Sequence, residues 1–177
     1  EQVVLSIDDG APEYGIRSIE QNMAWLNRFR CPPGGATIQG IECYFNLIPA
    51  GQTLQMLIWS DPNGDGRPDD AQVIWSGLRT AEGNDVVTRY NVPDVSVGEG
   101  GGNFFVGFIT TATQSDFPAG LDRNGPVGGN PLPDCSWIVD SASSINPNNL
   151  SAVTGTNGFF GTIEDVLFPG NWVLRPV

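Results

Sequence analysis

The chain contains no lysine and no histidine in its 177 residues. Without histidine it cannot build a Ser-His-Asp triad, a Cys-His dyad or a His-rich zinc site. Without lysine it lacks a Schiff-base nucleophile and the lysine of a phosphate-binding loop. Paired carboxylates are the one common catalytic device left, and no spacing between the acids singles out a pair of the kind that a glycosidase places across a cleft. We therefore expect a protein that is not an enzyme.

Positive charge and long hydrophobic runs are also scarce. The chain carries 20 acidic residues against 8 arginines, for a net charge of −12. So acidic a surface repels phosphate backbones and anionic lipid surfaces, which argues against nucleic acid as a partner and against membrane binding. Apolar runs extend over only a handful of residues. We therefore predict no membrane insertion.

Cysteine is limited to Cys31, Cys43 and Cys135, so at most one intramolecular disulfide can form. Cys43 alternates with Ile41 and Phe45, which places its side chain on the apolar face of a strand and predicts a buried free thiol. Cys31 and Cys135 each adjoin a proline-rich segment at a strand–loop junction, so the pair Cys31–Cys135 is preferred. Spacing alone does not decide the pairing, and three free thiols remain the alternative.

The sequence begins Glu1-Gln2-Val3, without an initiator methionine. That start is typical of a secreted protein after signal cleavage, although a trimmed chain begins in the same way. Abundant glycine and proline, 23 and 14 residues, also fit a secreted β-protein. We expect a secreted protein, extracellular or at a cell surface.

Short apolar or alternating runs, broken by Gly, Pro, Asn and Asp, predict an all-β protein. Ten strands separated by turns favour a single domain over residues 1–177, built as a two-sheet antiparallel β-sandwich of jelly-roll type with long loops. One short helix is allowed within Glu13–Ala24, and Gln114–Asp134 and Ser143–Asn157 read as long loops. The expected strands are Val3–Asp8, Ala24–Cys31, Ala36–Asn46, Thr53–Ser60, Gln72–Arg79, Val86–Val92, Asn103–Thr113, Ser136–Ser141, Gly158–Glu164 and Asn171–Val177.

The most informative motif is the run from Asp61 to Asp70, Asp-Pro-Asn-Gly-Asp-Gly-Arg-Pro-Asp-Asp, which lies between two predicted strands. Side-chain oxygens fall at the alternate positions 61, 63 and 65, and Gly66 follows at once. Ca²⁺ takes six to eight oxygen ligands, which such a run can supply, and a bound dication relieves repulsion between the acids. The alternative is a solvated hairpin turn, because Asp, Asn, Gly and Pro are all turn formers.

This run resembles the first half of an EF-hand loop, but Gln72 stands where the bidentate glutamate of an EF-hand would be. The predicted flanking strands make it more similar to the short calcium loops of dockerins and thrombospondin type 3 repeats. The resemblance implies a calcium site formed by Asp61, Asn63, Asp65, the carbonyl of Arg67, and Asp69 or Asp70.

Other acids and aromatics are weaker candidates. A remote calcium ligand or a second metal site is conceivable at Asp8-Asp9-Gly10 with Glu13, or at Asp122 with Asp116 and Asn124, although plain turns explain both groups. The five tryptophans offer stacking platforms for sugars only if they are exposed, and core packing is the default for large aromatics. They are Trp25, Trp59, Trp75, Trp137 and Trp172.

Seven segments in succession are similar to those of uncharacterised β-sandwich domains in secreted, multi-domain bacterial proteins. The resemblance covers nearly the full length and implies fold and location, but no activity. The segments that carry it are Asp8–Gly10, Trp25–Phe29, Ile58–Asp61, Phe104–Phe108, Phe117–Asp122, Ser136–Trp137 and Asn171–Arg175.

Two functions are compatible with these patterns. The preferred one is a calcium-stabilised structural, assembly or adhesive subunit of a cell surface, filament or matrix, with copies of itself as partners. The alternative is a carbohydrate-binding module of a secreted enzyme, with a polysaccharide as partner. The alternating apolar face of residues 3–7 predicts a first strand that pairs within its own domain or, alternatively, adds to the sheet edge of a neighbouring copy.

Overall fold

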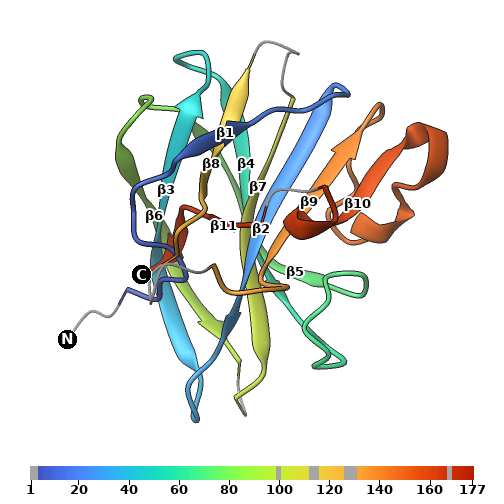
Figure 1. The fold of residues 1–177 in the computed structure, drawn as a ribbon. Helices are drawn as coiled ribbons and strands as arrows, with labels where there is room; N and C mark the ends of the chain where they lie inside the picture. The colour runs from blue at the N-terminus through green and yellow to red at the C-terminus, as the bar shows by residue number, and fades with distance from the viewer. Residues whose placement is uncertain (1–3, 99–100, 112–115, 126–130, 167–168) are drawn as a thin grey trace.

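The computed structural model describes residues 4–98, 101–111, 116–125, 131–166 and 169–177, which form strands and three short 3₁₀ helices (Figure 1). The strands are β1 (Tyr14–Ile16), β2 (Asn22–Arg30), β3 (Ala36–Leu47), β4 (Thr53–Ser60), β5 (Gln72–Thr80), β6 (Val87–Val97), β7 (Asn103–Thr111), β8 (Phe117–Asp122), β9 (Ser136–Ser141), β10 (Gly158–Thr162), β11 (Asn171–Trp172) and β12 (Leu174–Pro176). The 3₁₀ helices are η1 (Leu150–Ala152), η2 (Gly155–Asn157) and η3 (Ile163–Val166).

The strands form two antiparallel sheets that pack face to face, which confirms the predicted all-β sandwich. One sheet has the order β1-β8-β3-β12, with β11 also paired to β8 and β6 also paired to β3. The other has the order β10-β9-β2-β7-β4-β5. Figure 1 shows β3 and β6 on one side of the molecule and β9 and β10 on the other, with β2 and β7 between them.

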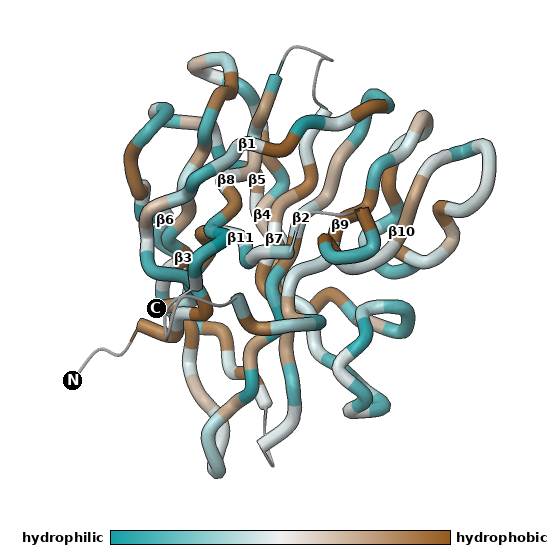
Figure 2. Tube along the Cα trace, viewed as in Figure 1, coloured by the Kyte–Doolittle hydropathy of each residue, from teal (hydrophilic) through white to brown (hydrophobic). Residues whose placement is uncertain are grey.

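The main core fills the space between the sheets because alternate residues of each strand point inward. Trp25 of β2 stacks on Phe108 of β7 at 5.5 Å between ring centroids, and Phe45 of β3 meets Phe108 edge-on at 5.7 Å. Ile41, Cys43 and Phe45 are all at most 1% exposed, which confirms the alternation predicted for that strand. Figure 2 shows the brown, apolar segments lying mainly along the strands.

A second, smaller core covers the outer face of the β2–β7 sheet. The residues of β2 that point away from the main core, Ala24 and Leu26, pack there with Phe105, and Leu150 of η1 lies over them. The indole N–H of Trp59 donates to the carbonyl oxygen of Pro147 at 2.7 Å. The predicted loop Ser143–Asn157 is therefore a cover for one sheet, which explains why β2 and β7 are buried on both faces.

Two segments that we predicted to lack strands contain them. Residues 14–16 form β1 where a short helix was allowed, and β8 runs through the predicted long loop Gln114–Asp134. β8 lies inside its sheet, with Gly120 paired to Gly15 and Ala119 paired to Phe45. Its sequence FPAGLD has Pro and Gly and no alternation, so only pairing on both sides makes it a strand.

The ends of the chain also differ from the prediction. Among residues 4–8 there is no strand, although the N–H of Leu5 donates to the carbonyl of Pro176 at 3.1 Å and Ile7 is buried in the main core. Val3, the first residue of the predicted strand Val3–Asp8, lies outside the described ranges. The predicted strand Asn171–Val177 is divided into β11 and β12, which pair with different neighbours, and Gly158–Glu164 becomes β10 followed by η3.

The predicted Cys31–Cys135 disulfide is wrong, since all three cysteines are free thiols. Cys135 lies opposite Arg28, where the Arg28 N–H donates to the Cys135 carbonyl at 2.7 Å. Cys31 is three residues further along, about 10 Å at the usual rise of a strand, which exceeds the Cα separation of a disulfide. Cys43 is a buried free thiol, as predicted.

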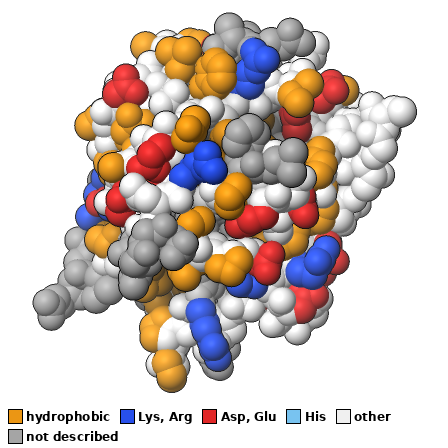
Figure 3. All heavy atoms as spheres, in the orientation of Figure 1, with side chains coloured by type: hydrophobic (Ala, Val, Ile, Leu, Met, Phe, Trp, Pro, Cys, Tyr) orange, Lys and Arg blue, Asp and Glu red, His pale blue; other side chains and the backbone are white. Residues whose placement is uncertain are grey.

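Within the described part of the chain, no helix is long and apolar enough to cross a bilayer. On the face shown in Figure 3, acidic, basic and hydrophobic side chains are interspersed. The net charge of −12 is therefore not gathered into one acidic patch on that face.

Candidate functional site

The run from Asp61 to Asp70 is the connection between β4 and β5 (Figure 1). Ser60 and Gln72 are cross-strand partners at the point where the two strands separate, so the loop projects from the end of an antiparallel pair. Figure 2 shows it as a largely hydrophilic segment near the lower right of the molecule.

Asp61 is the anchor of the loop. Its side chain is buried, and its two oxygens accept the N–H groups of Gly64 at 3.0 Å and Gly66 at 2.8 Å. The amide of Asn103, at the start of β7, donates to Asp61 at 2.9 Å and to the Gly64 carbonyl at 3.3 Å. Asp61 therefore closes the turn and ties it to the neighbouring strand.

Asn63 and Asp65 extend the same pattern. The Asp65 N–H donates to the Asn63 side-chain oxygen, and the Arg67 N–H donates to the Asp65 carboxylate, both at 2.8 Å. Gly66 has φ +82°, and a Cβ there would lie 2.2 Å from a nitrogen of Arg28. The sharp turn predicted at Gly66 is present, and its positive φ favours glycine.

Arg67 and Asp69 lie on the outer side of the loop. The Arg67 guanidinium lies 5.4 Å from the centroid of the Trp137 ring, and its Nε is 3.9 Å from Asp69. Both side chains of that ion pair are exposed, so solvent weakens it. The Asp69 carbonyl accepts the hydroxyl of Ser151 at 3.4 Å, which connects the loop to the cover segment 143–157.

Among the acids of this loop, Asp70 is the one with an unsatisfied side-chain oxygen. One of its oxygens is buried and has no hydrogen-bond partner. Burial raises the pKa of Asp70, and the charges of Asp61, Asp69 and Asp65 raise it further, while the N–H of Asn63 opposes them. The charges of the three other carboxylates of the predicted set therefore act on Asp70. A cation near Asp70 would relieve this repulsion and would also give its unpaired oxygen a partner.

As placed, the loop is closed by N–H donors and not by a cluster of ligands. Within the described ranges, no group of three or more Asp, Glu or Cys side chains could hold a metal ion. A carboxylate offers about four acceptor positions; Asp61 uses three and Asp65 uses two. The remaining positions and the unpaired Asp70 oxygen are the donor capacity for Ca²⁺, which requires side chains to turn inward.

The other acid groups have partners of their own. Asp8 is buried against Arg175, whose Nε donates to it at 2.9 Å. Asp122 accepts the N–H groups of Asp9 at 2.6 Å and of Gly125 at 2.8 Å. Both groups therefore organise turns at the chain ends and the end of β8, which agrees with the turn interpretation.

The tryptophans are mainly core residues. Trp25, Trp59, Trp137 and Trp172 are at most 3% exposed. Trp75 on the edge strand β5 is half-buried and carries the Arg79 guanidinium 5.5 Å from its ring centroid. A coplanar sugar-stacking platform of several tryptophans is therefore ruled out by burial.

Asn103 and Arg28 are among the residues that contact the loop and that the sequence did not indicate. An Arg28 nitrogen donates to the Gly66 carbonyl at 3.3 Å. The available signal was weak: Arg28 is one of two arginines near the end of its strand, and Asn103 follows a glycine-rich turn. Neither pattern indicates which loop lies beside it.

Comparison with known proteins finds one weak structural similarity. No family model matches the chain, and no curated protein matches it. Among solved structures, the chain is similar to the crystal structure of the cysteine protease and lectin-like domains of Cwp84, a surface layer associated protein of Clostridium difficile. The identity is 14% and the TM-score 0.49, over 88% of this chain and 32% of that chain. A similarity this low supports no conclusion about ligand, activity or location.

Proposed function

We propose that this chain is a non-catalytic, extracellular β-sandwich module whose 61–70 loop binds one Ca²⁺. The ion would be held by Asp61, Asn63, Asp65, the Arg67 carbonyl and Asp70, with Asp69 at the outer side. The observation that carries the proposal is the buried, unpaired oxygen of Asp70 beside three further carboxylates. Bound Ca²⁺ would offset the excess negative charge of this loop, whose four carboxylates stand against the single arginine Arg67.

The role of the ion would be structural. The loop touches β7 through Asn103, β2 through Arg28 and the cover segment through Ser151. An ion that stiffens the loop would therefore stabilise the end of the sandwich where three elements meet. Such a module suits a structural or adhesive subunit of a surface, filament or matrix, and the missing histidine and lysine support a non-enzymatic role.

The first experiment measures calcium binding directly. Isothermal titration of chelator-treated protein with CaCl₂ should show one site, and the matched titration with MgCl₂ should be much weaker, since Mg²⁺ dehydrates reluctantly and demands octahedral geometry. The Asp65→Ala variant should lose the heat of binding. No heat with wild-type protein at millimolar Ca²⁺ would refute the site.

The second experiment addresses the role. Sedimentation of the protein with and without Ca²⁺ should show larger species in Ca²⁺ if the module assembles with copies of itself. The competing role, a carbohydrate-binding module, is favoured only by the half-exposed Trp75 and predicts retention on a polysaccharide that is lost in Trp75→Ala. A monomer that binds no polysaccharide would contradict both roles.

A further inference from the structure

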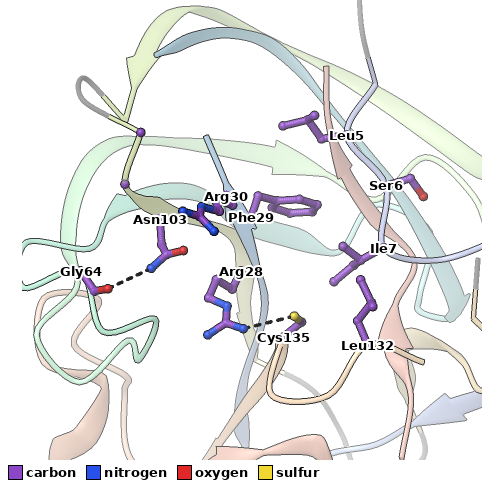
Figure 4. Close-up of a pocket in the computed structure, with 12 residues that line it drawn as sticks. Leu5, Ser6, Ile7, Arg28, Phe29, Arg30, Gly64, Asn103, Leu132 and Cys135 are labelled. Atoms are coloured by element: carbon purple, nitrogen blue, oxygen red, sulfur yellow. Dashed lines mark hydrogen bonds between the residues drawn. The ribbon is translucent and has the colours of Figure 1, made fainter. Parts of the chain in front are cut away.

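A cavity of about 620 Å³ opens beside the 61–70 loop. Five segments meet there: residues 5–7, the end of β2, Gly64, residues 101–103 and the segment before β9. Figure 4 shows Arg28, Arg30 and Asn103 on one side of it and Leu5, Ile7 and Leu132 on the other. Cavities of roughly 300–1,000 Å³ are the size that small ligands occupy.

The charge of this cavity is opposite to that of the protein. Two of the 8 arginines, Arg28 and Arg30, are among its described lining residues, while none of the 20 acids is. Asp61 contacts the lining residues Gly64 and Asn103, and its carboxylate is occupied by the N–H groups of Gly64 and Gly66 and by the amide of Asn103. In a chain of net charge −12, this is a local positive site.

The two guanidinium groups retain donors for a ligand. Arg28 uses two of its N–H groups, one to the Gly66 carbonyl and one to the Cys135 sulfur at 3.5 Å, and neither partner is an anion. A guanidinium carries five N–H donors, so three remain. Arg30 is exposed and forms no ion pair or hydrogen bond with any residue in the described ranges.

We infer that this cavity binds the carboxylate of a small organic acid or of a uronic acid at the end of a polysaccharide. A guanidinium binds a carboxylate through two parallel N–H···O bonds. The recognition groups are therefore the Arg30 guanidinium and the remaining N–H donors of Arg28. Phe29, Ile7 and Leu132 form the apolar wall against the carbon skeleton. The inference does not require Ca²⁺ in the neighbouring loop.

The two sources of the carboxylate are separated by the probes. The protein is titrated with benzoate, with trigalacturonate and with neutral galactotriose, at low and high ionic strength. Binding of benzoate alone assigns a hydrophobic acid, and binding of trigalacturonate alone assigns an acidic polysaccharide. Binding of either acid should weaken at high ionic strength, because salt screens the charge of the arginines. Equal binding of the neutral sugar, or no binding of either acid at 10 mM as the order-of-magnitude upper limit of a useful site, would overturn the inference.

Substitution of the arginines tests the residues. Arg30→Gln removes a guanidinium that forms no ion pair or hydrogen bond within the described ranges, so the variant should keep the wild-type melting temperature and bind the acid about tenfold more weakly. Arg123→Gln is the matched control, since Arg123 is an exposed arginine that lies 5.2 Å over the Tyr14 ring, outside the cavity lining. An Arg30→Gln protein with unchanged affinity would contradict the assignment.

Cys135 provides a second readout because it lines the cavity, while Cys31 and Cys43 are buried. The rate of modification by 5,5′-dithiobis(2-nitrobenzoate), itself a dicarboxylate, should fall when the bound acid is present and should fall in Arg30→Gln. The neutral reagent 4,4′-dithiodipyridine should show the protection by ligand but no effect of Arg30→Gln. If neither the bound acid nor Arg30→Gln changes the modification rate of Cys135, a site at this position is refuted.

Discussion

The sharpest test of the calcium loop is the replacement of Asp70 by Asn, which keeps the size of the side chain and removes its charge. Without Ca²⁺, Asp70 is held close to three other carboxylates with one oxygen unpaired. Asp70→Asn should therefore be no less stable than wild type in EDTA. With Ca²⁺ the order should reverse, because the variant loses one charged ligand.

The expected size follows from linkage. A ligand at 100 times its Kd that binds only the native state adds about 2.7 kcal/mol, which corresponds to roughly 5–11 °C in Tm for a domain of this size. We expect wild type to gain that much between EDTA and saturating CaCl₂, and Asp70→Asn to gain less than about half of it at the same concentration. Differential scanning calorimetry measures both.

The pH dependence gives an independent check. The pKa of Asp70 is raised in the folded state, so in EDTA its contribution favours folding below the ordinary carboxyl pKa and is lost as pH rises through the raised value. Ca²⁺ needs the ionised carboxylate, so its stabilisation should be full at pH 7 and should decline as the pH falls through the raised pKa of Asp70.

Glu82→Gln is the matched control, since Glu82 is an exposed acid outside the loop and the same single charge is removed. Its calcium-dependent gain should equal that of wild type. If Asp70→Asn keeps the full gain, or if Glu82→Gln loses as much, the ion does not bind where we place it.

Four further predictions concern the fold and the thiols. Asp61→Ala should lower stability by about 2–4 kcal/mol even in EDTA, because three donors lose their acceptor; chemical denaturation measures it, and a loss below 1 kcal/mol contradicts the anchor role. Arg175→Ala should cost about 3–5 kcal/mol by leaving Asp8 buried and unpaired, and the additional change Asp8→Asn should recover part of that in the same assay. Leu150→Ala, at a side chain 1% exposed in the second core, should cost about 2–5 kcal/mol; an unchanged midpoint would show that the cover segment does not stabilise the sheet. In the native protein one thiol should react quickly and two slowly, because burial raises the pKa of Cys31 and Cys43; three equal rates would be inconsistent with the fold.

Much of the fold could be predicted because it depends on neighbours in sequence. β4 and β9 have the bounds expected from their apolar patterns, and the ends of β3 and β5 differ by one residue. The turn at Gly66 was also predictable, since an alternating Asx pattern followed by glycine encodes a local backbone shape. β6 extends five residues beyond the expected Val92, past Pro93, which is tolerated because β6 pairs on one edge with β3 only.

The predictions that were wrong share a cause that is not local in the sequence. β8 has no alternation of its own, and it is a strand because β1 and β3 pair with it on either side. Cys31 and Cys135 looked equivalent in sequence, yet the register of β2 against β9 sets Cys135 opposite Arg28. Such decisions rest on pairing between distant segments, which a local pattern does not encode.

By itself, then, the sequence determined the all-β class, the buried faces of the central strands, the turn geometry of the 61–70 loop and the absence of histidine and lysine chemistry. Only the tertiary structure decided that segment 143–157 covers the outer face of one sheet and that Arg28 and Arg30 line a cavity whose described lining residues include no carboxylate. The physical reason is one of range. Side-chain alternation and turn formation act over a few residues, while burial of a second face and convergence of charges depend on which distant segments the packed core brings together.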